Sequence, residues 1–253
     1  MNLLQAALLG AVEGITEFLP VSSTGHLILA SHWMGLQGEA VKTFDVVIQA
    51  GALAAVLGLY GGRLRSLPLL RNLAVGFLPA GAAGLLLHRA IKEHLFGTYP
   101  VAVALAAGGL FMIWLDRRMR RWALPPSRSL ETLGPGEVFF IGTAQCLALW
   151  PGTSRSMVTI AAALLLGLSA PAAAEFSFLL ALPTLGAATL FDAAKNGELL
   201  LHEVPFFSIA TGFVVAGITA ALTMRGLVRY LNRRGLAPFG WYRLLLALAV
   251  FFT

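Results

Sequence analysis

Long apolar runs dominate this chain and restrict it to folds that a lipid bilayer can solvate. Six runs approach the roughly 20 apolar residues that a helix needs to cross the hydrocarbon core. They cover residues 44–60, 73–88, 100–115, 172–191, 205–224 and 238–253, and the last is short for a full crossing. Charged residues make up only 12% of the chain, against about 25% in a soluble domain. Because so few charges cannot cover a water-soluble surface, we expect a polytopic membrane protein with about six transmembrane helices.

Two further apolar segments, 1–35 and 136–168, are interrupted by proline and by clustered Glu, Ser, Thr, His or Arg. Irregular backbone at membrane depth persists only where protein or a wet cavity satisfies its polar groups. We therefore expect each segment to form a broken or re-entrant helix. The predicted fold is all-α, with two such segments among the spans.

Arginines gather in three short clusters, which lie in the loops 61–72, 116–131 and 225–237. Basic loops favour the cytoplasmic side of a membrane. We expect these loops inside, the loops 89–98 and 193–204 outside, and both chain termini on the periplasmic side. The net charge of +6 comes from these clusters. They do not lie along one amphipathic face, so we do not expect nucleic acid as a partner.

The reversed charge bias divides the chain into two halves of opposite topology, and a weak internal similarity supports this division. The segment Glu13-Gly-Ile-Thr-Glu17 can be aligned with Gln145-Cys-Leu-Ala-Leu149, and the alignment continues with a slip of one residue. Each half is then a polar broken segment followed by three spans. This combination is typical of an inverted repeat, whose site lies near mid-membrane where broken helix ends meet. We expect one membrane domain, 1–253, with repeats at about 1–118 and 133–253.

Two glutamates stand out in the first broken segment. Glu13 and Glu17 are four residues apart, so one helical turn places both carboxylates on the same face. An ionised carboxylate inside a membrane costs about 2.5–3.5 kcal/mol even on a lenient scale. A divalent cation, a nearby arginine or a shared proton would each offset this cost, and oxygen ligands favour Mg²⁺ or Ca²⁺. A pair of glutamates at a wet helix end is the plain structural alternative.

A hydroxyl-rich turn, Val21-Ser-Ser-Thr-Gly-His26, follows these glutamates directly after Pro20. Serine and threonine are favoured helix caps, and we expect Ser22 and Thr24 to serve as such. Ser23 and His26 are three residues apart, a helical spacing that suits a nucleophile and its base. In the following span, Asp45 and Gln49 either line the same site or pair between helices.

The second broken segment carries Pro151-Gly152-Thr153-Ser154-Arg155-Ser156 at the start of an apolar helix. Amides at a helix N-terminus attract anions, and arginine adds a planar fork that matches phosphate oxygens. This turn, with its three hydroxyls and one guanidinium, therefore predicts a phosphate site. The alternative is a buried arginine that pairs with Glu13 or Glu17, and both roles are compatible in a resting site.

These motifs resemble those of the undecaprenyl pyrophosphate phosphatases of the bacitracin-resistance type. The resemblance is carried by Glu13-Gly-Ile-Thr-Glu-Phe-Leu-Pro-Val-Ser-Ser-Thr-Gly-His26 and by Pro151-Gly-Thr-Ser-Arg-Ser156 with Thr159. It implies a hydrolase of the bacterial inner membrane that converts a C55 isoprenoid pyrophosphate to the monophosphate carrier and inorganic phosphate. The carrier serves peptidoglycan and other envelope polymers, and its recycling implies bacitracin resistance. The resemblance assigns catalysis to Glu13, Glu17, Ser23, His26 and Arg155, and phosphate binding to Ser154 and Thr159 beside Arg155.

The residues and the resemblance agree on a mechanism for such an enzyme. Ser23 would attack the terminal phosphorus with His26 as base, while direct attack by water or by His26 stays open. The expected partners are the C55 pyrophosphate and the lipid bilayer, and a homodimer is left open. The alternative function is a polyprenyl-phosphate transporter or flippase, because inverted repeats with broken helices are also a transporter architecture.

Overall fold

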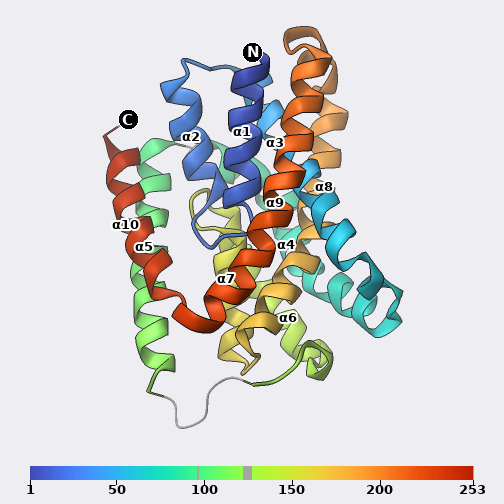
Figure 1. Cartoon of the computed structure of the whole chain (residues 1–253), viewed down its shortest axis with the longest axis vertical. Helices are drawn as coiled ribbons and strands as arrows, with labels where there is room; N and C mark the ends of the chain where they lie inside the picture. Colours follow the sequence, from blue (N-terminus) through green and yellow to red (C-terminus); the bar gives the residue numbers. More distant parts are fainter. Residues whose placement is uncertain (96, 122–126, 253) are drawn as a thin grey trace.

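Ten α-helices make up the computed structural model (Figure 1), which describes residues 1–95, 97–121 and 127–252. In chain order they are α1 Leu3–Thr16, α2 Ser23–Trp33, α3 Glu39–Tyr60, α4 Leu67–His94, α5 Thr98–Met119, α6 Pro135–Gln145, α7 Arg155–Leu165, α8 Ala170–Glu203, α9 Phe206–Arg234 and α10 Ala237–Phe251. Three short 3₁₀ helices connect them: η1 Gly61–Arg65, η2 Leu130–Thr132 and η3 Cys146–Leu149. The predicted all-α membrane fold is confirmed.

Within the described ranges, five helices are long and apolar enough to cross a membrane: α3, α4, α5, α8 and α9. They correspond to the first five predicted spans. The sixth predicted span is α10, whose 15 residues extend only about 22 Å at 1.5 Å per residue. A helix of this length is shorter than a hydrocarbon core of about 30 Å.

Several predicted loops are helical, which corrects their boundaries. The loop expected at 193–204 lies almost wholly within α8, and residues 225–234 belong to α9. Likewise, α4 continues to His94 through part of the loop expected at 89–98. The predicted spans end where charged residues begin in the sequence. The helices continue further, because charged residues do not interrupt backbone hydrogen bonding. Residues 122–126 of the expected loop 116–131 lie outside the described residues.

Each predicted broken segment forms two short helices joined by a turn. The first turn connects α1 to α2, and the second, with η3, connects α6 to α7. Ser22 and Ser154 cap α2 and α7, and their hydroxyls accept from the amides of Gly25 and Met157. With φ of 71° and 72°, these two serines are the non-glycine residues of positive φ in the described chain. Such backbone is costly by about 1–3 kcal/mol and is found mainly at functional sites.

If α1 to α5 are matched in order with α6 to α10, helix pairs in one half have equivalent pairs in the other. α1 packs against α9 as α6 packs against α4, while α3 pairs with α8 and α5 with α10. A Cβ on Gly10 would come within 2.4 Å of the Gly212 carbonyl oxygen, and one on Gly142 within 2.3 Å of the Gly76 oxygen. Small residues of this kind allow close backbone crossings in membranes. We propose on this basis that the halves are inverted repeats.

The two turns enter from opposite ends and meet inside the molecule, while the chain termini lie at one end (Figure 1). A direct hydrogen bond joins the turns, because the Ser156 hydroxyl donates to the Leu19 carbonyl at 2.8 Å. This meeting point brings the two sequence motifs together.

Candidate active site

A small polar cavity of about 110 Å³ lies where the two turns meet. Its lining comes from both halves: Glu17, Ser22, Ser23, Thr24, Gln49, Ala148, Pro151, Gly152, Ser154, Arg155 and Leu185. The first residues of α2 and of α7 both belong to this lining. Helix N-termini carry partial positive charge and free amides, so two of them on one cavity make a site for an anion such as phosphate.

Glu17 links the two motifs at the centre of this site. Its Oε1 accepts a hydrogen bond from Arg155 Nη2 at 3.0 Å, and its Oε2 accepts from the Ser23 hydroxyl at 2.7 Å. The side chains of the ion pair are each only 7% exposed. The expected pairing of the buried arginine with Glu17 is therefore formed, and the Ser23 hydroxyl has a carboxylate as its proton acceptor.

Arg155 is held from two further directions. Its Nη1 donates to the Ser177 carbonyl at 2.8 Å, and the Ser177 hydroxyl lies 2.7 Å from that of Thr159. The guanidinium also lies 5.8 Å from the centre of the Phe18 ring, within cation–π range. Its Nε, although buried, has no hydrogen-bond partner among the described residues. One donor of Arg155 is thus buried without a partner in the described part of this structure.

Glu13 is fully buried, and neither of its carboxylate oxygens accepts a hydrogen bond within the described part of the chain. It interacts electrostatically with Glu17, Asp45 and Arg155. Asp45 Oδ1 is likewise buried without a described partner. Unsatisfied buried carboxylate oxygens are costly, and a cation would satisfy them.

The acidic groups fit a magnesium-type site better than an all-protein metal cage. Among the described residues, no group of three or more His, Cys, Asp or Glu side chains is placed to hold a metal ion. Mg²⁺, however, is usually bound by one or two carboxylates together with substrate phosphates and water. Glu13, with its unpartnered oxygens, and Glu17, whose oxygens accept from Arg155 and Ser23, would be the two carboxylates of such a site.

His26 lies one helical turn beyond Ser23 but is engaged elsewhere. Its Nδ1 is 2.8 Å from the Ser22 carbonyl oxygen, and its Nε2 is 2.7 Å from the Tyr242 hydroxyl. The expected pair of Ser23 with His26 is therefore not formed in this structure. The hydroxyl of Ser23 donates to Glu17 instead.

The phosphate motif of the second half splits into two groups. Gly152, Ser154 and Arg155 line the polar cavity, whereas Thr153, Ser156 and Thr159 do not belong to its lining. Ser156 bonds to the opposite turn, and Thr159 bonds to Ser177 behind Arg155. Ser156 and Thr159 therefore hold the motif in place in this structure, and phosphate binding by Thr153, Ser156 and Thr159 stays a prediction.

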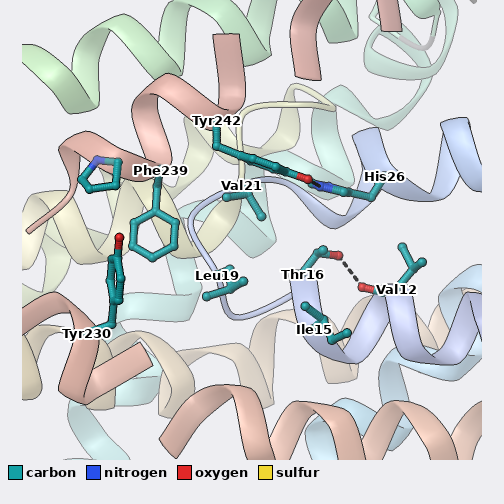
Figure 2. A pocket seen from close by; sticks show the side chains of 10 residues that line it. Val12, Ile15, Thr16, Leu19, Val21, His26, Tyr230, Phe239 and Tyr242 are labelled. Atoms are coloured by element: carbon teal, nitrogen blue, oxygen red, sulfur yellow. Dashed lines mark hydrogen bonds between the residues drawn. The ribbon is translucent and has the colours of Figure 1, made fainter. Parts of the chain in front are cut away.

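An apolar groove of about 430 Å³ borders the same turn of chain, and Figure 2 shows the side chains that line it. It lies between α1, the following turn, α9 and α10, and is lined by Val12, Ile15, Thr16, Leu19, Val21, His26, Tyr230, Pro238, Phe239 and Tyr242. The adjacent rings of His26 and Tyr242 form part of its wall, the imidazole edge meeting the phenol (Figure 2). His26 thus belongs to the groove, and Ser22 and Ser23, on the same turn of chain, belong to the polar cavity.

Two site residues on α10 were not singled out in the sequence. Tyr242 contacts His26, and the fully buried Arg243 donates to the carbonyls of Gly152 at 2.8 Å and Pro20 at 3.5 Å. Arg243 also donates to two carbonyls of α5, those of Ala104 and Leu105. An arginine inside the apolar run 238–253 was the available signal, since an intramembrane charge marks a functional region.

The chain was compared with known proteins. It matches the family described as bacitracin resistance protein BacA over residues 6–249. It is 51% identical over 259 residues to an undecaprenyl-diphosphatase of Sorangium cellulosum (strain So ce56), covering 97% of this chain and 84% of that protein. It is 44% identical to an undecaprenyl-diphosphatase of Nitrosomonas europaea and 43% identical to one of Acidovorax ebreus (strain TPSY), covering 99% of this chain and 94% of each relative. The chain therefore belongs to the bacitracin resistance protein BacA family.

Proposed function

We propose that this protein is a phosphatase of the bacterial inner membrane that hydrolyses undecaprenyl diphosphate to undecaprenyl phosphate and inorganic phosphate. The observation that carries the proposal is the meeting of two helix N-termini, Arg155 and a Ser23–Glu17 hydrogen bond around one small polar cavity. The relatives of this chain bear the name of that activity. Recycling the lipid carrier supports cell-wall synthesis and, with it, resistance to bacitracin.

The two parts of the substrate, the diphosphate and the isoprenoid chain, bind in the polar cavity and the apolar groove respectively. The polar cavity, with Arg155 and the helix N-termini, suits the diphosphate. The apolar groove suits the isoprenoid units nearest the phosphates, and the rest of the tail lies in the bilayer. Because the groove lining reaches His26, the lipid-bound phosphate lies close to the imidazole.

Ser23 is the nucleophile in this proposal. Its oxygen forms a bond to the terminal phosphorus while the bond from that phosphorus to the bridging oxygen breaks, and undecaprenyl phosphate leaves. The Ser23 proton passes to Glu17 Oε2, which already accepts its hydrogen bond. Water then cleaves the phosphoserine and releases inorganic phosphate. Glu17 takes the role of base that the sequence spacing suggested for His26.

Positive charge around the transferred phosphoryl group is the main requirement of such a reaction. Arg155 and the amides at the starts of α2 and α7 supply part of it. A Mg²⁺ or Ca²⁺ ion, when bound, would supply the remainder by neutralising phosphate oxygens. Glu13 would hold it, with Glu17 as the second carboxylate.

A lipid flippase of the same architecture is the competing function. Transport requires gates and a binding site, but it does not require a hydroxyl that is hydrogen-bonded to a buried carboxylate. The Ser23–Glu17 contact therefore favours hydrolysis.

The test is phosphate release from undecaprenyl diphosphate by the purified protein in detergent, with Mg²⁺ or Ca²⁺ present. We expect turnover by the wild type, loss of at least 10³-fold in Ser23→Ala, as for removed nucleophiles, and little change in Ser31→Ala. Ser31 is a matched control because it is a buried serine on the same helix.

Three results would contradict parts of the proposal. Absence of phosphate release by folded wild-type protein would refute the function. Normal activity of Ser23→Ala would show that Ser23 is not the nucleophile and that water attacks the phosphorus directly. Full activity after rigorous chelation would show that the mechanism needs no cation, and Glu13 and Glu17 would then act as acid–base groups.

A further inference from the structure

We propose that Tyr242 is a positioning residue that fixes the orientation and the tautomer of the His26 ring beside the lipid-bound phosphate. This inference rests on the proposed function and adds a residue to its site. The supporting contact is a 2.7 Å hydrogen bond between the Tyr242 hydroxyl and His26 Nε2, formed across 216 residues of sequence.

The partner of the other ring nitrogen determines the tautomer of the neutral imidazole. His26 Nδ1 lies 2.8 Å from the Ser22 carbonyl oxygen. A carbonyl oxygen can only accept, so the hydrogen of the neutral ring must be on Nδ1. Nε2 then presents its lone pair to Tyr242, whose hydroxyl donates to it. The unprotonated nitrogen, Nε2, is therefore the one that faces Tyr242.

Both ends of this contact are held by rigid parts of the site. Ser22 is the positive-φ cap of α2, so its carbonyl direction is set by the same turn that builds the polar cavity. Tyr242 precedes Arg243, which anchors α10 to the carbonyls of Pro20 and Gly152, one from each turn. The Tyr242 hydroxyl is thus placed relative to both phosphate-facing turns.

The ring geometry shows a contact through the polar edges. The His26 and Tyr242 rings are nearly parallel, 9° apart, with centroids separated by 5.6 Å. Figure 2 shows them side by side, with the imidazole edge toward the phenol oxygen. Removing the hydroxyl therefore removes the hydrogen bond while leaving the aromatic wall of the groove intact.

The first experiment compares Tyr242→Phe with Tyr99→Phe in the phosphate-release assay. Tyr99 is an exposed tyrosine on α5 outside the groove, and no hydrogen bond of its hydroxyl is found within the described chain. We expect kcat to fall about 10-fold or more in Tyr242→Phe, which corresponds to about 1.4 kcal/mol, the scale of one lost hydrogen bond. KM should change little, because the ring still packs against the tail. Equal effects of the two substitutions, or a change in KM alone, would overturn the proposal.

A double-mutant cycle with His26→Ala separates positioning from general packing. If Tyr242 acts through His26, Tyr242→Phe should cause no further loss in the His26→Ala background. An undiminished further loss would show that Tyr242 acts independently of the histidine.

A spectroscopic measurement tests the contact without substrate. In protein with ¹⁵N-labelled histidine, the His26 signals should show the Nδ1–H form with Nε2 as acceptor, and Tyr242→Phe should shift the Nε2 signal. Tyr99→Phe should not. An unchanged Nε2 signal in Tyr242→Phe would refute the positioning role even if hydrolysis is confirmed. A shifted signal in a protein that releases no phosphate would instead place the failure in the proposed function.

Discussion

Glu17 divides its two carboxylate oxygens between a guanidinium and a hydroxyl, both supplied within a nearly closed site. Burying an ion pair in this way is weak evidence for a stabilising role, because the desolvation cost offsets most of the attraction. A functional explanation is stronger: the carboxylate keeps Arg155 oriented and Ser23 ready to lose its proton. Breaking the pair from either side would leave an uncompensated buried charge.

Replacing Arg155 with lysine tests whether shape or charge matters at this position. Lysine preserves the charge beside Glu17 but cannot also reach Ser177 and offer a further donor to phosphate, as the planar guanidinium does. We expect Arg155→Lys to fold and insert normally and to lose about 10²–10³-fold in kcat, typical of one removed electrostatic contact. Steady-state kinetics with thermal unfolding in detergent provide the measurement.

Arg65→Lys is the control for this substitution, since Arg65 is exposed on η1 and should tolerate the change. Near-normal kcat in Arg155→Lys, together with instability of Arg155→Ala, would show that the arginine only balances Glu17. Phosphate recognition would then depend on the helix N-termini and the cation.

The sequence predicted which residues of the two motifs gather, and the structure explains the limit of that prediction. Glu17, Ser23 and Arg155 carry unusual polarity in apolar segments, so each could be identified locally. The partner of His26 could not, because spacing along one helix favoured Ser23, whereas Tyr242 is contributed by α10 at the far end of the chain. Local periodicity contains no information about which distant helix packs alongside.

At the scale of elements, α10 is a short helix whose main polar contribution is to hold the two turns. Arg243 is fully buried and donates to four backbone carbonyls, those of Pro20, Ala104, Leu105 and Gly152. None of the ion pairs found in the described chain includes this arginine. Its charge is therefore balanced by carbonyl dipoles of the two turns and of α5.

Removing this arginine should loosen both turns together. Arg243→Met preserves bulk but leaves buried carbonyl oxygens unsatisfied, each at a cost of about 1–3 kcal/mol. We expect a loss of roughly 3 kcal/mol or more in stability, read as a lower thermal midpoint in detergent, and we expect activity to fall with it. Arg243→Lys should recover part of both, since an ammonium can still donate to some of the carbonyls.

The matched comparison is Arg121→Met, at an exposed arginine near the end of α5, which should leave the thermal midpoint within a degree or two of the wild type. Wild-type stability of Arg243→Met would show that water or neighbouring groups satisfy the carbonyls, and that α10 does not anchor the turns.

Helix existence was predicted well from the sequence, and helix length was not. Each predicted span overlaps an observed helix, because apolar runs of this length have few alternatives in a membrane. Yet α8 continues past Lys195 and Glu198 to Glu203, since charged residues that face water do not interrupt helical hydrogen bonding. The hydropathy of a segment therefore predicts the apolar part of a helix, whereas the end of the helix depends on its capping residues.

For the molecule as a whole, the three arginine clusters converge on one end. Arg63, beyond α3, pairs with Glu131 and with Glu175 at the start of α8. Arg120, just beyond α5, donates to the carbonyl of Arg234 at the end of α9. The loops that the sequence grouped by charge are therefore neighbours in space. We propose that this end faces the cytoplasm, because basic loops favour that side, and that both termini face the periplasm.

Single cysteines in a Cys146→Ser background test this orientation. Position 203, exposed at the end of α8, should react with a membrane-impermeant maleimide added to intact cells, whereas exposed position 121 should react only after the membrane is permeabilised. Both positions lie outside the polar site, so both variants should keep phosphatase activity, which confirms that the labelled protein is folded. Labelling of position 121 from outside in an active variant would invert the proposed topology. Equal labelling of both positions in intact cells would indicate two orientations, in which case the arginine clusters do not determine how this chain inserts.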